Sequence, residues 1–188
     1  MVLLPRLTAF AEAYPDIALD VVTVTGPVDL VAGEFDAGIQ LGEYIQKDMI
    51  AVRVTQELRL AVVGSPGYFA SRSIPEKPKD LNGHRCIGLR LSGGPYRWEF
   101  EKGRKAVTIG VDGPLIVDDT NLVIRAVLAG VGLGLAYEEQ VAEYVAKHRL
   151  IRVLEDWTPP IPGFFMYYPS RHHQPAALSA LVGALRLS

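Results

Sequence analysis

The sequence has very little cysteine and no hydrophobic run long enough to cross a bilayer. Cys86 is the one cysteine among 188 residues, which excludes an internal disulfide. It lies in the strand-like run 85–89, and we expect a small buried hydrophobe in a reducing compartment rather than a reactive thiol. Pro5 and Arg6 interrupt the first apolar residues, so no signal peptide is expected. No apolar run approaches the ~20 residues of a membrane span. We therefore expect a cytoplasmic protein with no membrane partner.

The sequence also lacks an excess of positive charge. It has 19 Lys and Arg residues against 21 Asp and Glu residues, a formal net charge of −2. A surface that binds duplex DNA needs basic side chains to neutralise phosphates, so these residues alone are not expected to hold DNA. Hydrophobic residues make up 49% of the chain and charged residues 21%, which is typical of a folded protein rather than a disordered one. The length allows one domain or two small lobes.

Hydrophobic periodicity predicts alternating helices and strands in the first third of the chain. Apolar residues at helical spacing predict a helix over residues 2–14, and alternation with β-branched residues predicts a strand over 17–24. Pro27 and Gly33 bracket a short predicted helix at 28–32, and a strand follows at 35–41. This strand–helix–strand order is typical of a parallel βαβ unit. Two further strands are expected at 50–54 and 57–63.

The remainder of the chain repeats the mixed pattern after a polar segment at 71–84, which is expected to hold a short helical turn at 79–82. Acidic and Thr side chains at 118–120 offer N-caps for a helix that Gly130 ends, and a short buried strand follows at 131–136. The other predicted strands are 86–90, 98–101, 107–111, 115–117, 150–154 and 164–168, and the other predicted helices are 138–146 and 176–187. These blocks predict an α/β protein with mostly parallel sheets and two lobes.

Several short motifs, in order and correctly spaced, resemble LysR-type effector domains over essentially the whole chain. The most recognisable is DLVAGEFDAGI at residues 29–39, followed by LG at 41–42. The other motifs are LPRL at 4–7 leading to Phe10, YPDI at 14–17, SPGYF at 65–69, PKDLNGH at 78–84, AGVGL at 129–133 and YYPSR at 167–171.

The resemblance implies a fold similar to type II periplasmic binding proteins, in which two lobes joined by two crossing strands enclose a ligand cleft. It implies that residues 1–64 and 165–188 form lobe I and residues 65–164 lobe II. Family members also carry a winged helix-turn-helix, a linker helix and a first strand before the helix that begins here near Val2, and we expect these to be absent from this chain. Because that strand belongs inside a sheet, its neighbours would have unpaired edges. We expect the slot to be filled, the lobe to be distorted, or two copies to pair.

Candidate ligand-binding residues lie where predicted strands end, because ligands of α/β sheets gather at the carboxyl ends of strands. The helix starting near Thr120 offers backbone N–H groups to an anion, although capping by Asp119 or Thr120 is an equally simple interpretation. Arg90 could pair with a ligand carboxylate or with a surface carboxylate of the protein. The full candidate set is Gly42, Glu43, Ser65, Leu89, Arg90, Thr120, Asn121 and Tyr137.

Other patterns are interpreted as structural. The glycines of residues 130–134 close a helix and enter a strand, the reverse of a dinucleotide fingerprint, so we expect them to serve the turn and close packing. Val63 occupies the first glycine position of a nucleophile elbow around Ser65, and His84 and Asp80 are expected to be loop residues. Adjacent His172 and His173 lack partners at metal-ligand spacing.

Tyr96 and Trp98 are expected to pack lobe II or to wall the cleft. No catalytic set, metal or cofactor is predicted, and the chain is not expected to be an enzyme. The resemblance predicts a domain that binds a small effector, with a weak preference for an organic anion, and regulates an absent DNA-binding domain. A homodimer or higher homo-oligomer is expected. The alternative is a solute-binding protein of a transport system, which shares the fold.

Overall fold

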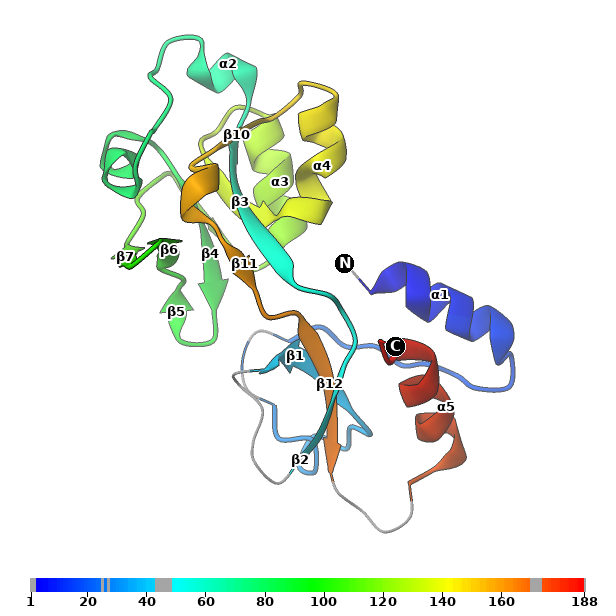
Figure 1. Cartoon of the computed structure of the whole chain (residues 1–188). Coiled ribbons are helices and arrows are strands. Elements are labelled where there is room, and N and C mark those ends of the chain that lie inside the picture. Colours follow the sequence, from blue (N-terminus) through cyan, green and yellow to red (C-terminus); the bar gives the residue numbers. More distant parts are fainter. Residues whose placement is uncertain (1–2, 25, 27, 43–48, 170–173, 188) are drawn as a thin grey trace. The chain divides into compact units, whose positions relative to one another are not determined.

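The computed structural model describes residues 3–24, 26, 28–42, 49–169 and 174–187 (Figure 1). The chain forms two compact units: unit 1 is Met1–Leu58 with Pro162–Ser188, and unit 2 is Arg59–Ile161. The sequence-based division placed residues 59–64 in the first lobe and 162–164 in the second, whereas here 59–64 belong to unit 2 and 162–164 to unit 1. Each unit has its own core and is described separately.

Unit 1 is a three-stranded sheet packed against two helices. The strand order is β1 (Gly38–Leu41), β12 (Phe164–Pro169), β2 (Met49–Arg53), and both pairings are antiparallel. The helices α1 (Leu4–Ala13) and α5 (Ala176–Leu185) contact each other. Their apolar side chains meet those of the sheet in one core of Leu3, Leu7, Val52, Val54, Met166, Tyr168, Leu178 and Leu185.

Arg6 connects the start of the chain to its end in unit 1. Its guanidinium donates to the backbone carbonyls of Ala184 at 3.1 Å and Arg186 at 3.3 Å, and also to that of Val54. Carbonyls at a helix C-terminus lack intrahelical partners, and a basic side chain there satisfies them and complements the helix dipole. Arg6 therefore caps α5 from α1, a contact between residues 178 and 180 positions apart that no local pattern predicts.

Two predicted elements of unit 1 do not form. Residues 17–24 make no strand, and Val21, Val22 and Val24 are more than half exposed. A strand requires a hydrogen-bonding neighbour, and the only strand that pairs with β1 among the described residues is β12. Residues 28–32 form turns rather than a helix, because Asp29 Oδ1 accepts the N–H groups of Val31 and Ala32 and Gly33 N–H closes the turn onto the Asp29 carbonyl. The predicted βαβ unit is therefore wrong.

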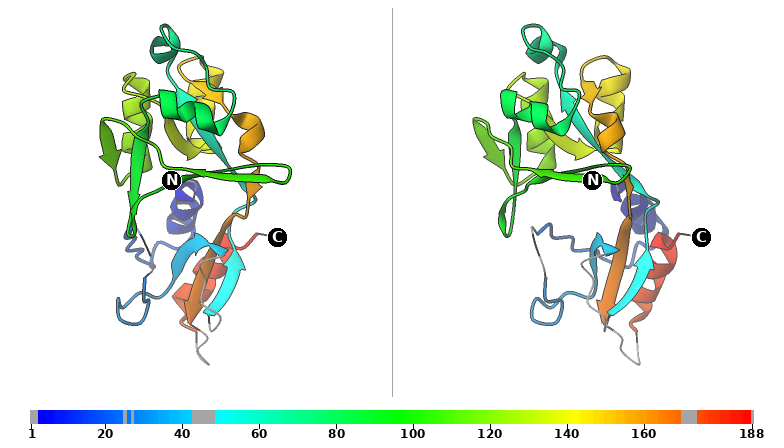
Figure 2. Two further views of the ribbon diagram at one scale, coloured as in Figure 1. Left: turned by 90° about the vertical axis from the view of Figure 1, so that its left-hand side faces the viewer. Right: turned by 60° about the vertical axis from the view of Figure 1, so that its left-hand side comes forward.

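Unit 2 contains a larger set of strands with two helices that lie side by side, α3 (Thr120–Leu128) and α4 (Glu138–Ala146) (Figures 1 and 2). Both helices contact β9. Three short helices, α2 (Pro66–Phe69), η2 (Pro78–Gly83) and η3 (Glu155–Trp157), connect the strands. The strands are β3 (Leu58–Gly64), β4 (Ile87–Leu91), β5 (Gly94–Pro95), β6 (Trp98–Lys102), β7 (Lys105–Ile109), β8 (Leu115–Val117), β9 (Gly134–Tyr137), β10 (Ile151–Val153) and β11 (Pro160–Ile161).

Strand direction decides which residues of unit 2 can share a site. β4 and β8 are parallel, with Leu89 opposite Val117, and a parallel bridge joins Cys86 to Leu133 at the start of β9. The carboxyl ends of β4, β8 and β9 therefore point the same way. β3 is antiparallel to β9, with Leu60 opposite Tyr137. The end of β3 consequently lies at the opposite edge of the sheet.

The prediction of mostly parallel sheets is not confirmed. Among the described residues, β4 and β8 form the parallel strand pair, and the remaining strand pairs with a described register are antiparallel. The physical reason is the insertion of distant strands: β12 lies between β1 and β2 and runs opposite to both, and β3 runs opposite to β9 and β10. Sequence order alone does not reveal such insertions.

The interior of unit 2 contains large side chains on both sides of its strands. Trp98 is fully buried in a cluster with Tyr68, Leu81 and Phe100, and Tyr96 packs against this cluster. A second cluster joins α3 and α4 to the strands through residues that include Ile87, Val123, Val127, Ala136 and Val141. Trp98 is therefore a core residue, as the packing interpretation predicted.

Candidate functional site

Three strand ends bring most of the sequence-predicted ligand residues to one edge of unit 2. Arg90 follows Leu89, whose Cα partner is Val117, and α3 begins three residues later at Thr120. Cys86 and Leu133 are bridged, so Arg90 and Tyr137 each lie four residues beyond that bridge on parallel strands. We call this set the strand-end edge: Leu89, Arg90, Thr120, Asn121 and Tyr137.

The N-terminus of α3 is capped by a carboxylate. Asp119 Oδ1 accepts the N–H groups of Asn121 at 2.7 Å and Leu122 at 3.1 Å, and Asn121 Nδ2 lies 3.5 Å from Asp119 Oδ2. These are amides that an anion at the helix N-terminus would use. Asp119 is therefore the N-cap of α3, and the negative charge of Asp119 would repel an anion that approached the same amides.

Arg90 and Thr120 retain unused hydrogen-bonding groups at the strand-end edge. Arg90 is exposed on β4 and forms no ion pair with any described residue. Thr120 is half-buried at the first position of α3, and its hydroxyl has no hydrogen-bond partner among the described residues. The edge thus offers a guanidinium and a hydroxyl to a ligand.

The other predicted residues differ in their surroundings. Tyr137 and Leu89 are half-buried, and the Tyr137 N–H donates to Gln140 Oε1 at 3.3 Å, which fixes the start of α4. Gly42 lies in unit 1 at the end of β1, where a Cβ would come within 2.9 Å of the Phe165 ring. Glu43 lies outside the described residues.

Ser65 does not share the strand-end edge. It follows β3, whose residue Val63 pairs with Gly134 at the start of β9, so it lies at the opposite edge. Its Oγ accepts the N–H of Tyr68 at 3.2 Å and caps α2, and the residue is only 6% exposed. The prediction grouped it with the other residues because it follows a strand, but that strand is antiparallel.

Ser65, His84 and Asp80 each interact with a different group. The Tyr68 hydroxyl and His84 Nδ1 share a hydrogen bond of 3.2 Å, and the Tyr68 oxygen accepts the N–H of Arg85 at 3.0 Å. Asp80 accepts the N–H groups of residues 76 and 77. Burial, with Arg72 nearby, lowers the pKa of His84. The three side chains therefore serve local structure and form no catalytic relay in the described chain.

Cys86 and the glycine-rich turn are also structural. Burial, with a smaller contribution from Asp112, raises the pKa of the Cys86 thiol to about 12, so the reactive thiolate is suppressed. Gly130 has φ +77° at the end of α3, and a Cβ on Gly132 would lie 2.4 Å from the Arg85 carbonyl oxygen. The turn and close-packing interpretation is confirmed. His172 and His173 lie outside the described residues. Within the described part of the chain, no group of three His, Cys, Asp or Glu side chains that could hold a metal ion is found.

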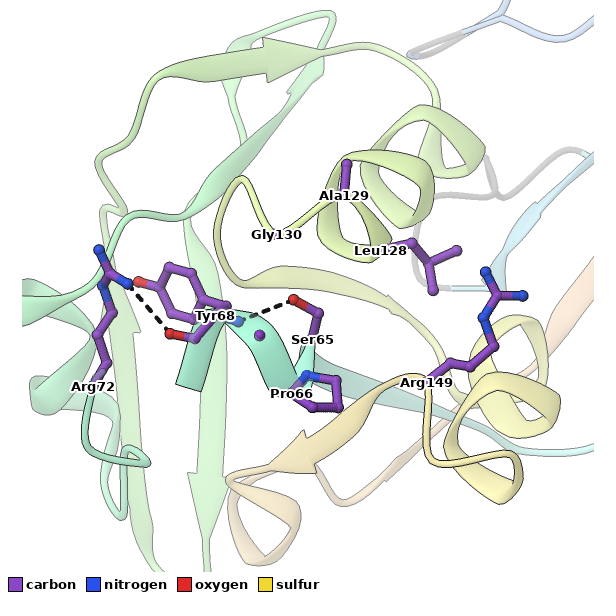
Figure 3. A pocket seen from close by; sticks show the side chains of 9 residues that line it. Ser65, Pro66, Tyr68, Arg72, Leu128, Ala129, Gly130 and Arg149 are labelled. Atoms are coloured by element: carbon purple, nitrogen blue, oxygen red, sulfur yellow. Dashed lines mark hydrogen bonds between the residues drawn. The ribbon is translucent and has the colours of Figure 1, made fainter. Parts of the chain in front are cut away.

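A surface cavity that sequence reasoning missed lies at the edge where Ser65 is placed (Figure 3). Its charged residues, Arg72 and Arg149, come from segments 77 positions apart, so no spacing pattern connects them. Tyr68, Leu128 and Gly130 line it with Ser65.

The LysR substrate binding domain model matches residues 1–187 of this chain. A putative transcriptional regulator of Pseudomonas aeruginosa is 44% identical over 186 residues, which cover 98% of this chain and 61% of that protein. The HTH-type transcriptional regulator PgrR of Escherichia coli K12 is 37% identical over 187 residues, covering 98% of this chain and 62% of that protein. The chain thus spans about three fifths of these relatives.

Solved structures give the same result for the fold. The full-length Vibrio cholerae virulence activator AphB, a member of the LTTR protein family, matches with a TM-score of 0.82 and 26% identity, covering 96% of this chain and 61% of that one. The regulatory domain of AphB from Vibrio vulnificus matches with a TM-score of 0.81 and 24% identity, covering 96% and 89%. Among the described residues, no helix combines the length and apolar character needed to span a membrane. The chain belongs to the LysR substrate-binding domain family, the effector-binding domain of LysR-type transcriptional regulators.

Proposed function

We propose that the strand-end edge of unit 2 binds the effector and that the effector is a small organic anion. The observation that carries this proposal is the parallel register of β4 and β8, which brings Arg90 and Thr120 to one edge. A guanidinium can hold a carboxylate with two parallel hydrogen bonds, and a threonine hydroxyl can donate a third. Because Asp119 occupies the helix amides, Arg90 supplies the main attraction for the anion.

Effector binding regulates transcription only if the effector prefers one arrangement of the protein over another. We propose that this preference is transmitted to an HTH segment, as the name of the HTH-type relative PgrR suggests, and that this segment would supply the DNA contacts. The net charge of −2 supports this division of labour, since this chain lacks the basic excess of a DNA-binding surface. A homodimer in the cytoplasm is part of the same proposal. A transport function is not favoured, because the relatives are named as regulators.

A thermal-shift screen of carboxylates, their neutral amides and aromatic compounds tests the ligand class. We expect at least one carboxylate to raise the melting temperature, its amide to have a smaller effect, and Arg90→Gln to abolish the difference. Arg104→Gln, at the exposed β6–β7 turn, is the matched control. Stabilisation by apolar compounds alone, or by carboxylates equally in Arg90→Gln, would refute the anion proposal.

The genomic sequence immediately upstream of Met1 tests the regulatory proposal. An in-frame helix-turn-helix would support regulation, and a signal peptide would support transport.

A further inference from the structure

The cavity beside Ser65 is a second candidate binding site within unit 2. Its volume is about 490 Å³, and it lies where β3 ends and the turn after α3 begins. Arg90 and Thr120 belong to the opposite edge of the strands, so this cavity is separate from the strand-end edge. Its apolar lining includes Pro66, Leu128 and Ala129.

The charged side chains of the cavity are both positive. Arg72 and Arg149 line it from two sides, and no acidic residue lines it (Figure 3). The Arg72 guanidinium lies 4.6 Å from the Tyr68 ring centroid and donates through Nη1 to the Tyr68 carbonyl and to Ser71 Oγ, both at 3.3 Å. Its remaining N–H groups have no partner in the described chain. The ring contact orients Arg72 without neutralising it.

Arg149 is likewise available. Its guanidinium lies 5.2 Å from the Tyr144 ring centroid and forms no ion pair with a described residue. The nearby carboxylate of Glu143 is paired with Lys147, which lowers its pKa. The charge of Arg149 also helps to lower the pKa of Glu143, but no acidic residue is among those that line the cavity, so its two exposed guanidinium groups make it electropositive.

Ser65 provides an unused donor inside this electropositive cavity. Its oxygen accepts the Tyr68 N–H, but its own hydroxyl proton has no acceptor among the described residues, although the residue is 94% buried. A hydroxyl has one donor and two acceptor positions, and a buried donor without a partner is rare in folded proteins. The Ser65 hydroxyl can therefore donate to an acceptor atom of a ligand in the cavity while it keeps its hydrogen bond from Tyr68.

We propose that this cavity binds a small organic carboxylate with an apolar body. One carboxylate oxygen accepts the Ser65 hydroxyl proton, the guanidinium groups of Arg72 and Arg149 attract the charge, and the apolar body lies against Pro66 and Leu128. The C-terminal end of α3 carries partial negative charge, which opposes an anion. Both cations are thus needed, and binding is expected to be weak and salt-sensitive.

Calorimetric titration with benzoate, benzamide and inorganic phosphate tests the proposal on the whole chain. We expect benzoate to bind better than either of the others, because only benzoate has both the charge and the apolar body. Arg72→Gln and Arg149→Gln should each weaken benzoate binding by about two- to fivefold, the range for exposed charge pairs. Ser65→Ala should weaken it as well, and circular dichroism will show whether α2 survives the loss of its cap.

Arg104→Gln serves as the control and should leave this affinity unchanged, while Arg90→Gln shows whether benzoate binds at the strand-end edge instead. Equal binding of benzamide or of phosphate would overturn the proposal, as would benzoate affinity unaffected by Arg72→Gln and Arg149→Gln. If Arg90→Gln abolished binding while Arg149→Gln did not, benzoate would be binding at the strand-end edge. That result would refute this inference and leave the proposed function intact.

Discussion

Replacing Asp119 tests how the start of α3 is stabilised and what it offers to a ligand. Asp119→Ala removes the acceptor of two backbone hydrogen bonds, from Asn121 at 2.7 Å and Leu122 at 3.1 Å. Loss of an N-cap typically costs about 1 kcal/mol, within a range of roughly 0.5–2 kcal/mol. A loss of that size lowers the melting temperature by about 2–4 °C in a domain of this length.

Asp119→Asn separates the cap from the charge. Asparagine keeps an acceptor oxygen in the same position but loses the carboxylate–dipole attraction, worth about 0.3–1 kcal/mol at an exposed helix end. We therefore expect stability to decrease in the order wild type, Asp119→Asn, Asp119→Ala. In the same series, Asp119→Asn should strengthen carboxylate binding at the strand-end edge, because it removes a negative charge beside Thr120.

Tryptophan fluorescence during urea unfolding measures the stability of unit 2, the unit that contains α3. Both tryptophans of the chain, Trp98 and Trp157, lie in unit 2, and Trp98 is fully buried. Asp118→Asn is the matched control, since Asp118 is exposed and accepts no hydrogen bond from a described residue. The capping argument is refuted if Asp119→Ala unfolds at the wild-type midpoint, or if Asp119→Asn loses as much stability as Asp119→Ala.

Three further predictions concern stability and association. Because the pKa of His84 is lowered in the folded state, that state binds fewer protons, so the free energy of unfolding should fall as pH drops from about 7.5 to about 5.5. Urea unfolding at a series of pH values should show a weaker dependence of this free energy on pH for His84→Gln. Gly132→Ala would place a Cβ 2.4 Å from the Arg85 carbonyl oxygen and should cost about 1–3 kcal/mol, while Gly83→Ala, with no atom within 4 Å, should cost far less by the same assay. Val22 is an apolar side chain that is 55% exposed in the segment 17–24, which forms no strand, so Val22→Lys should reduce self-association measured by sedimentation velocity; unchanged sedimentation would contradict this.

Local patterns predicted the elements whose partners are close in sequence or strongly periodic. The helix at 138–146 forms over those residues, and the strand at 115–117 has its predicted bounds. The stretch 17–24 has equally good β propensity, with three valines, yet forms no strand. Propensity describes how side chains fit a sheet, whereas a strand also needs a neighbour for its backbone groups. The resemblance implied a missing neighbour there, and the periodicity of the segment itself could not reveal it.

The rule that ligand residues follow strand ends groups residues correctly only where the strands are parallel. Arg90, Thr120 and Tyr137 come together because β4, β8 and β9 are parallel, as a strand-end rule assumes. Ser65 also follows a strand in the sequence, but β3 is antiparallel to β9, so Ser65 lies at the other edge.

The antiparallel insertion of β3 gives unit 2 two chemically different edges. At one edge, a carboxylate caps α3, so an anion must be attracted by Arg90 alone. At the other, α3 ends at Leu128, the helix dipole is unfavourable to an anion, and two guanidinium groups line the same cavity as the buried Ser65 hydroxyl. Because α3 runs from one edge to the other, an anion bound at either end interacts with the dipole of the same helix. Paired titrations with Arg90→Gln and Arg149→Gln would therefore show whether the two ends are coupled, since coupling between sites must be reciprocal.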